Sequence, residues 1–201
     1  MARGVIKAPF FEIGPKSYLY GDDVLELALA ADKASEKYGV EVIFTCPVVE
    51  IRRVVEATKH IHVFAPHMDP IPVGRGTADT LAESLVAAGA EGTQLNHVEK
   101  PLDFETLAAT IARAKEVGLM TMVCADSMAE ASKITTLKPT VVVAEPSELI
   151  GTGVSVGPEY VAAAFQCVKS VDQDVLVLTA AGIANGQDVY NTIIAGADAT
   201  G

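Results

Sequence analysis

The chain has 201 residues, half of them hydrophobic, which suffices for a sizeable core in one domain spanning residues 1–201. Its net charge of −11 argues against nucleic acid as the main partner, although backbone N–H groups can still bind a phosphorylated metabolite. The sequence has no leader and no apolar run long enough for a membrane span, so neither secretion nor a membrane partner is expected. Its three cysteines lack CxxC spacing, which favours a reducing cytoplasm over a disulfide framework.

Short β-rich runs alternate with helical patterns along the chain. Apolar residues at helical spacing predict helices at residues 21–38, 51–55, 81–89, 103–118, from 127 onward, 158–168 and 188–195. The β-rich runs begin near Val5, Val42, His62, Gly92, Met120, Val141, Val175 and Ala197. They recur at roughly the length of one βα unit, which predicts parallel strands joined by helices.

The predicted strands are apolar on both faces, which is typical of parallel strands covered by helices. Eight strands and seven helices predict an α/β fold, a (β/α)8 TIM barrel that lacks the last helix and the loop before it. A doubly wound open sheet is the alternative. That fold usually carries a glycine-rich fingerprint after its first strand, and Gly14-Pro15-Lys16 is no such fingerprint.

Lys16, His97 and Glu145 each follow a different predicted strand. Catalytic groups of such barrels lie at the carboxyl ends of the strands, so the three side chains are expected to share one rim. We expect Glu145 to act as a general base, His97 to hydrogen-bond a carbonyl oxygen, and Lys16 to stabilise an enediolate. The backbone N–H groups of Gly151 and Gly182 are expected to bind a phosphate group. The pattern indicates proton transfer next to a carbonyl group.

A loop follows Glu145 directly. Pro146 stiffens its first step, and Gly151 and Gly153 give the backbone freedom at its far end. A loop with this composition, placed beside a candidate base, is predicted to close over a small molecule as a lid.

Three stretches resemble motifs of a known family: Leu95-Asn96-His97-Val98-Glu99-Lys100, Ala144-Glu145-Pro146-Ser147-Glu148-Leu149-Ile150-Gly151-Thr152-Gly153, and Ala181-Gly182-Ile183. They are similar to triosephosphate isomerase of the short, archaeal-type branch, and the similarity spans nearly the whole chain. The family implies interconversion of glyceraldehyde 3-phosphate and dihydroxyacetone phosphate, in glycolysis and gluconeogenesis, with no cofactor or metal. Triosephosphate isomerase is itself the standard example of a glutamate base, a neutral histidine electrophile and a closing loop.

The resemblance also implies a role for each matching residue. It makes Glu145 the base, His97 the electrophile and Lys16 the electrostatic element. Glu99 becomes a supporting carboxylate near the lysine. The expected substrate-binding residues are Ile150, Gly151, Gly182 and Ile183. The expected partners are a small phosphorylated sugar and further copies of the chain, in a homo-oligomer that is a dimer or a tetramer.

Two residues depart from the family pattern. The family usually has an asparagine two residues before the catalytic lysine, where this chain has Gly14. Its serine after the catalytic histidine is replaced by Val98. These departures raise an alternative to the triose function, the isomerisation of another phosphosugar such as a tetrulose phosphate.

The sequence stops at Gly201, inside or just after the eighth predicted strand. The glycine-rich loop and the last helix of the family come after this point, so we expect either a fragment or a longer natural chain. The exposed strip of barrel is expected to lower the stability or to be covered by a neighbour. A phosphate-binding barrel or fragment without turnover is therefore a third hypothesis.

Two other histidines, His60 and His62, are spaced like a pair of metal ligands. No third ligand is found for them in the sequence, so a metal site is not expected. His67 also follows a predicted strand, and we expect it to have a loop or interface role.

Overall fold

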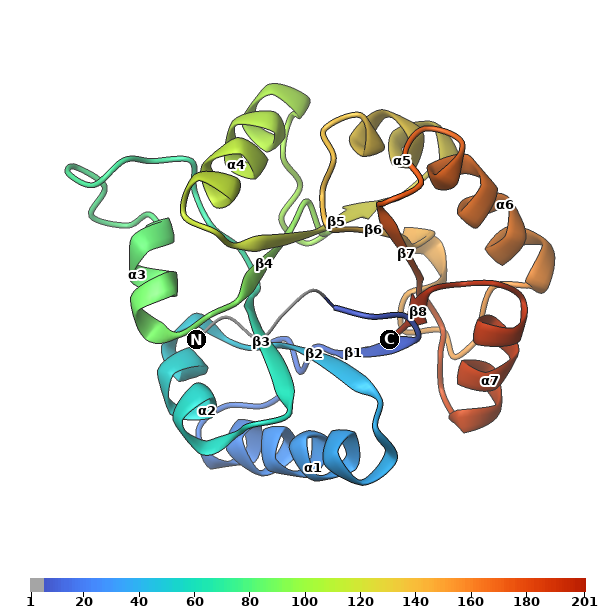
Figure 1. Ribbon diagram of the computed structural model, residues 1–201, viewed down its shortest axis with the longest axis horizontal. Coiled ribbons are helices and arrows are strands. Elements are labelled where there is room, and N and C mark those ends of the chain that lie inside the picture. The colour runs from blue at the N-terminus through green and yellow to red at the C-terminus, as the bar shows by residue number, and fades with distance from the viewer. Residues whose placement is uncertain (1–5) are drawn as a thin grey trace.

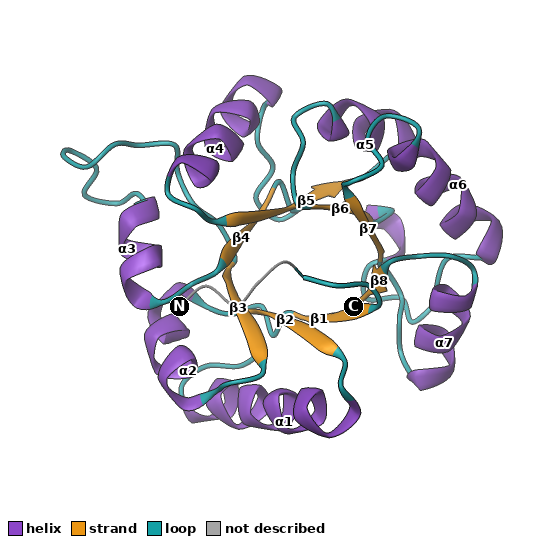
Figure 2. Cartoon of the chain, in the orientation of Figure 1, coloured by secondary structure: helices purple, strands orange, loops and turns teal. Residues whose placement is uncertain are grey.

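The computed structural model describes residues 6–201 and forms a closed ring of parallel strands surrounded by helices (Figures 1 and 2). The strands follow one another around the ring in chain order: β1 (Phe10–Ile13), β2 (Glu41–Thr45), β3 (Ile61–Ala65), β4 (Gly92–Leu95), β5 (Met120–Ala125), β6 (Val141–Ala144), β7 (Leu176–Thr179) and β8 (Ala199–Thr200). The predicted (β/α)8 barrel is therefore confirmed, and the open sheet is wrong.

Seven α-helices lie outside the ring within residues 6–201 (Figure 2). They are α1 (Asp22–Tyr38), α2 (Ile51–Ala57), α3 (Ala82–Ala88), α4 (Phe104–Glu116), α5 (Met128–Thr135), α6 (Pro158–Lys169) and α7 (Gly186–Ile194). Short 3₁₀ helices follow β2 and β6, at η1 (Val48–Glu50) and η2 (Ser147–Leu149). The described chain reaches Gly201 directly after β8, without an eighth helix, as predicted.

The ends of the helices follow local signals in the sequence. The Asp103 side chain accepts a hydrogen bond from the backbone N–H of Thr106, and Ser127 does the same for Glu130. Gly39 and Gly89 end α1 and α3 in the left-handed conformation, which glycine adopts without strain. Local chemistry of this kind explains why the helix boundaries lie close to those predicted.

The core has two parts, because alternate residues of each strand face opposite sides. Ile43 of β2 packs inside the ring with Phe10 and Phe64. Phe44, the next residue, packs outside the ring, between strands and helices. Each strand is thus covered on both faces, which is why most of its residues are apolar.

The ring closes between its first and last strands. Phe10 pairs with Ala199 and Phe11 with Thr200, and the N–H of Phe10 donates to the carbonyl of Asp198 at 3.2 Å. The first strand begins at Phe10, later than predicted, and Val5 lies outside the described residues. Closure brings the carboxyl ends of β1, β4 and β6 to one rim.

At the amino ends of the strands, a buried histidine joins two carboxylates. The His62 ring contacts Glu91 through Nδ1 at 2.8 Å and Glu41 through Nε2 at 2.7 Å. Burial alone would lower the pKa of His62, but the two hydrogen bonds outweigh it and raise that pKa above its ordinary value. His62 is therefore part of an ion triad that links β2, β3 and the residue before β4.

We predict that His62→Ala lowers the free energy of unfolding by roughly 3 kcal/mol at pH 6, because it leaves two carboxylates without their shared partner. The pKa of His62 is raised on folding, so the stabilisation is complete below the unfolded pKa and is lost as the pH rises through the folded pKa. Urea unfolding at pH 6 and pH 9 measures both effects.

His60→Ala is the matched control, because it removes a more exposed contact with Asp32 and should cost less than ~1 kcal/mol. The free energy of unfolding is compared between the wild type and His62→Ala at both pH values. If the two proteins differ by the same amount at pH 6 and pH 9, His62 is not charged in the folded protein.

Candidate active site

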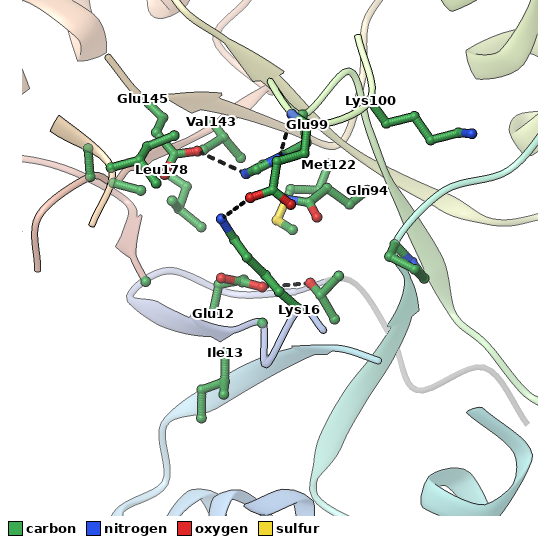
Figure 3. A pocket seen from close by; sticks show the side chains of 18 of the residues that line it. Glu12, Ile13, Lys16, Gln94, Glu99, Lys100, Met122, Val143, Glu145 and Leu178 are labelled. Atoms are coloured by element: carbon green, nitrogen blue, oxygen red, sulfur yellow. Dashed lines mark hydrogen bonds and ion pairs between the residues drawn. The ribbon is translucent and has the colours of Figure 1, made fainter. Parts of the chain in front are cut away.

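The three predicted catalytic side chains follow three different strands and line one cavity of about 720 Å³. Lys16 follows β1, His97 follows β4, and Glu145 is the first residue after β6. All three line the cavity, which opens at the carboxyl ends of the strands, and Figure 3 shows Lys16 and Glu145 directed into it. The ring closure thus brings together residues that are far apart in the sequence.

Lys16 forms an ion pair inside this rim. Its Nζ atom lies 2.9 Å from Oε1 of Glu99 (Figure 3). The hydrogen bond from Lys16 lowers the pKa of the Glu99 carboxyl group, which keeps that group ionised. Lys16 has a φ of 50°, in the left-handed region that side chains rarely adopt. The predicted supporting residue, Glu99, therefore lies where it can orient the ammonium group.

The geometry around His97 defines its tautomer. The backbone N–H of Glu99 donates to Nδ1 of His97 at 3.2 Å, so the proton of a neutral ring lies on Nε2. Nε2 lies 3.8 Å from Oε2 of Glu145. Burial, together with the positive charge of Lys16, lowers the pKa of His97. The imidazole is therefore neutral at neutral pH and presents an N–H donor to the cavity.

Asn96 fixes the backbone that carries this histidine. Its amide nitrogen donates to the carbonyl of Cys124 at 2.9 Å and to the Glu130 carboxylate at 3.0 Å, and its oxygen accepts from the N–H of Leu102. Asn96 is buried and has a φ of 57°. These bonds hold a strained residue directly before His97, a pattern common where a structure positions a reactive group.

Glu145 is enclosed by protein and faces the cavity. Burial raises the pKa of its carboxyl group, and the charge of Lys16 acts in the opposite direction. The backbone N–H of Glu145 donates to the carbonyl of Ala125 at 3.0 Å, which extends the strand pairing up to this residue. A carboxylate held on a strand end, with a raised pKa and little water around it, suits a general base.

Two hydrogen bonds hold the loop after Glu145 in place. Ser147 donates its N–H to the Asp126 carboxylate at 2.6 Å, and the Thr152 hydroxyl group donates to the Leu149 carbonyl at 2.8 Å. Gly151 and Gly153 have φ values of 75° and 71°. Both conformations suit glycine, which explains the Gly-Thr-Gly motif.

The four predicted substrate-binding residues line the same cavity. They are Ile150 and Gly151 in the loop after β6, and Gly182 and Ile183 in the turn after β7. Gly182 has a φ of 71°, and a Cβ atom there would overlap the carbonyl of Val154. The two segments therefore pack together, and only glycine permits their close approach.

Among the lining residues that were not predicted from the sequence are three polar residues of the strands: Glu12, Thr45 and Gln94. Glu12 and Thr45 lie on strands that also contribute the apolar residues Phe10 and Ile43 to the interior. The signal that was available is Glu12 itself, a carboxylate within the apolar run of the first strand.

Within residues 6–201, no group of three or more His, Cys, Asp or Glu side chains is arranged to hold a metal ion. Among these same residues, no helix has the length and apolar character needed to span a membrane. His67 contacts Asp69 at 3.1 Å, and Asp69 also accepts from the N–H of Thr80, so this histidine shapes the loop between β3 and α3.

Comparison with known proteins agrees with this geometry. A family model described as "Triosephosphate isomerase" matches residues 16–198. The chain belongs to the triosephosphate isomerase family. A triosephosphate isomerase of Saccharolobus solfataricus is 34% identical, over 98% of this chain and 88% of its own length. One of Metallosphaera sedula is 36% identical, over 98% and 87%.

A third relative, the triosephosphate isomerase of Methanocaldococcus jannaschii, is 37% identical over 89% of this chain and 82% of its own length. The predicted resemblance to archaeal members of the family is therefore confirmed. The prediction of an isomerase of triose phosphates is confirmed with it.

We predict that Lys16→Met raises the pKa of both His97 and Glu145, because the ammonium group lowers both. NMR titration of the His97 ring and of the Glu145 carboxyl carbon measures the two shifts. Lys100→Met is the control, since Lys100 lines the same cavity and does not contribute to either shift. Unchanged pKa values in Lys16→Met, or equal changes in both variants, would contradict this electrostatic account.

Proposed function

We propose that the chain interconverts glyceraldehyde 3-phosphate and dihydroxyacetone phosphate through an enediolate, with Glu145 as base, His97 as electrophile and Lys16 as the stabilising charge. One observation carries the assignment of these roles. A neutral imidazole, an enclosed carboxylate and an ammonium group line a single cavity, and the imidazole lies 3.8 Å from the carboxylate. The two groups lie close enough for both to reach neighbouring atoms of one small substrate.

The reaction begins when the Glu145 carboxylate takes a proton from the carbon next to the carbonyl group. The C–H electron pair forms the enediolate double bond, and negative charge develops on the carbonyl oxygen. The Nε2–H of His97 donates to that oxygen, and the ammonium group of Lys16 stabilises the charge. Glu145 then returns the proton to the neighbouring carbon, while the hydroxyl proton moves from one substrate oxygen to the other by way of Nε2 of His97. The two transfers together yield the isomer and restore the base.

The phosphate group fixes the position of the substrate in the cavity. We propose that it binds the backbone N–H groups of Gly151 and Gly182, with Ile150 and Ile183 as apolar walls. Glycine supports this role because a residue without a Cβ atom allows close approach of an anion. Binding energy from this non-reacting end then positions the reacting carbons between Glu145 and His97.

We also propose that residues 1–201 act as one domain in a homo-oligomer, a dimer or a tetramer. Tyr18, Tyr20 and Val49 support it, because these side chains are 80–88% exposed, the tyrosines after β1 and Val49 on η1. Their burial between copies would also hold the loop that carries Lys16. A reducing cytoplasm is proposed as the location, since Cys46 and Cys124 are buried free thiols.

We predict that Glu145→Gln lowers kcat by roughly 10³- to 10⁴-fold, because the amide cannot accept the proton. Glu145→Asp should lower kcat by about 10²-fold, since a shorter side chain withdraws the base from the carbon. A coupled assay of triose phosphate isomerisation measures both values, and circular dichroism checks the fold.

Glu148→Gln is the matched control, because Glu148 is an exposed carboxylate of the same loop. It should change kcat by less than about threefold, in line with a solvated surface charge. Full activity in Glu145→Gln would exclude Glu145 as the base.

For the assembly, we predict a mass of two or four chains by size-exclusion chromatography with light scattering. Tyr18→Ser combined with Val49→Ser should shift the mass toward one chain, since both changes remove apolar area from the exposed surface. A wild-type protein that elutes as a single chain at high concentration would contradict the proposed homo-oligomer.

A further inference from the structure

The floor of the cavity carries polar side chains where barrels usually carry apolar ones. Glu12 of β1, Thr45 of β2 and Gln94 of β4 all line it. Barrel interiors are generally filled by bulky branched residues, and the buried cluster inside this ring is apolar. The catalytic mechanism proposed above assigns no role to these three residues.

Glu12 has room and few partners. The Thr45 hydroxyl group donates to Oε1 of Glu12 at 2.6 Å, and among the described residues no other hydrogen bond reaches the Glu12 carboxyl group. A Cβ atom at position 14 would lie 3.0 Å from Oε1, and one at Gly201 would lie 2.9 Å from Oε2. Glu12 therefore occupies space that side chains at positions 14 and 201 would otherwise need.

Glu12 can both donate and accept near neutral pH. Burial raises the pKa of its carboxyl group to about 7, with the negative charge of Glu145 acting in the same direction and Thr45 and Lys16 against it. In Figure 3 the Glu12 carboxyl group is seen beside the base of the Lys16 side chain, and Glu145 is seen beyond its tip. A half-protonated carboxyl group suits a hydroxyl group, which also donates and accepts.

A bound triose phosphate has no oxygen atom left to hydrogen-bond the polar side chains on the floor of the cavity. Its two non-phosphate oxygens lie on the reacting carbons, where His97 and Lys16 act on them, and its phosphate group is held by glycine N–H groups. The cavity of about 720 Å³ lies within the ~300–1,000 Å³ typical of small-molecule pockets, so its volume does not limit the substrate to three carbons. A substrate with one more hydroxyl-bearing carbon would provide a partner for Glu12.

We propose that Glu12 is a specificity-determining residue that hydrogen-bonds the additional hydroxyl group of a four-carbon phosphosugar, so that the chain also isomerises this class of substrate. The proposal rests on the function proposed above. The chemistry is unchanged: the same proton moves between the first two carbons, and no further reactant is needed. Thr45 orients the Glu12 carboxyl group, and Gln94 adds a second polar group on the floor.

The test compares kcat/KM for erythrose 4-phosphate and glyceraldehyde 3-phosphate in the wild type, Glu12→Met and Glu12→Gln. Methionine keeps the length of the side chain but removes the hydrogen bond. We expect the ratio of the four-carbon to the three-carbon value to fall by about 10- to 100-fold in Glu12→Met. Glutamine still donates and accepts, so Glu12→Gln should keep the ratio within about fivefold of the wild type.

Thr45→Val provides a second test if Glu12→Met does not fold, because it removes the partner of Glu12 at nearly constant shape and should also lower the ratio. A wild type that isomerises the triose phosphate but not erythrose 4-phosphate would overturn the inference and leave the proposed function standing. An unchanged ratio in Glu12→Met would also overturn it. Activity on the four-carbon substrate alone would overturn both, because the inference adds this substrate to the triose phosphate.

Discussion

Closure of the strand ring between β1 and β8 is the constraint on which the site depends. Only a few backbone contacts make this seam, among them the pairing of Phe10 with Ala199 and the hydrogen bond to Asp198. The seam brings β1, and with it Lys16 and Glu12, round to the strands that carry Glu145 and the turn after β7. An open sheet of the same strands would leave β1 at an edge, away from the base.

Within the closed ring, one positive charge connects the reactive groups. The ammonium group of Lys16 pairs with Glu99, and it lowers the pKa of both His97 and Glu145. Burial has opposite effects on these last two groups: it lowers the pKa of the imidazole and raises that of the carboxyl group. Burial in the cavity and the charge of Lys16 together keep the His97 ring neutral, so that it can donate a hydrogen bond. The same charge opposes the effect of burial on Glu145, which keeps this carboxylate available as a base.

The sequence was sufficient to predict the barrel, because apolar strands and helical patterns alternate throughout. The Pro146 and Gly-Thr-Gly context also pointed to Glu145, which lines the cavity. Other features depend on three-dimensional position and could not be predicted. The hydrogen bond from Glu99 to His97 is a backbone contact that no residue type reveals. The inward direction of Glu12 depends on strand register, and the HxH spacing gave no sign that His62 lies between two carboxylates.

The central claim is that a base in this cavity moves a proton between two carbons of the substrate. Isomerisation of dihydroxyacetone phosphate in D₂O, followed by proton NMR of the glyceraldehyde 3-phosphate formed, tests it most directly. The account predicts deuterium on the carbon next to the aldehyde group, because the Glu145 carboxyl group exchanges its proton with solvent before returning it. Product that carries only the original hydrogen at that carbon would indicate a direct hydride shift and would contradict the account.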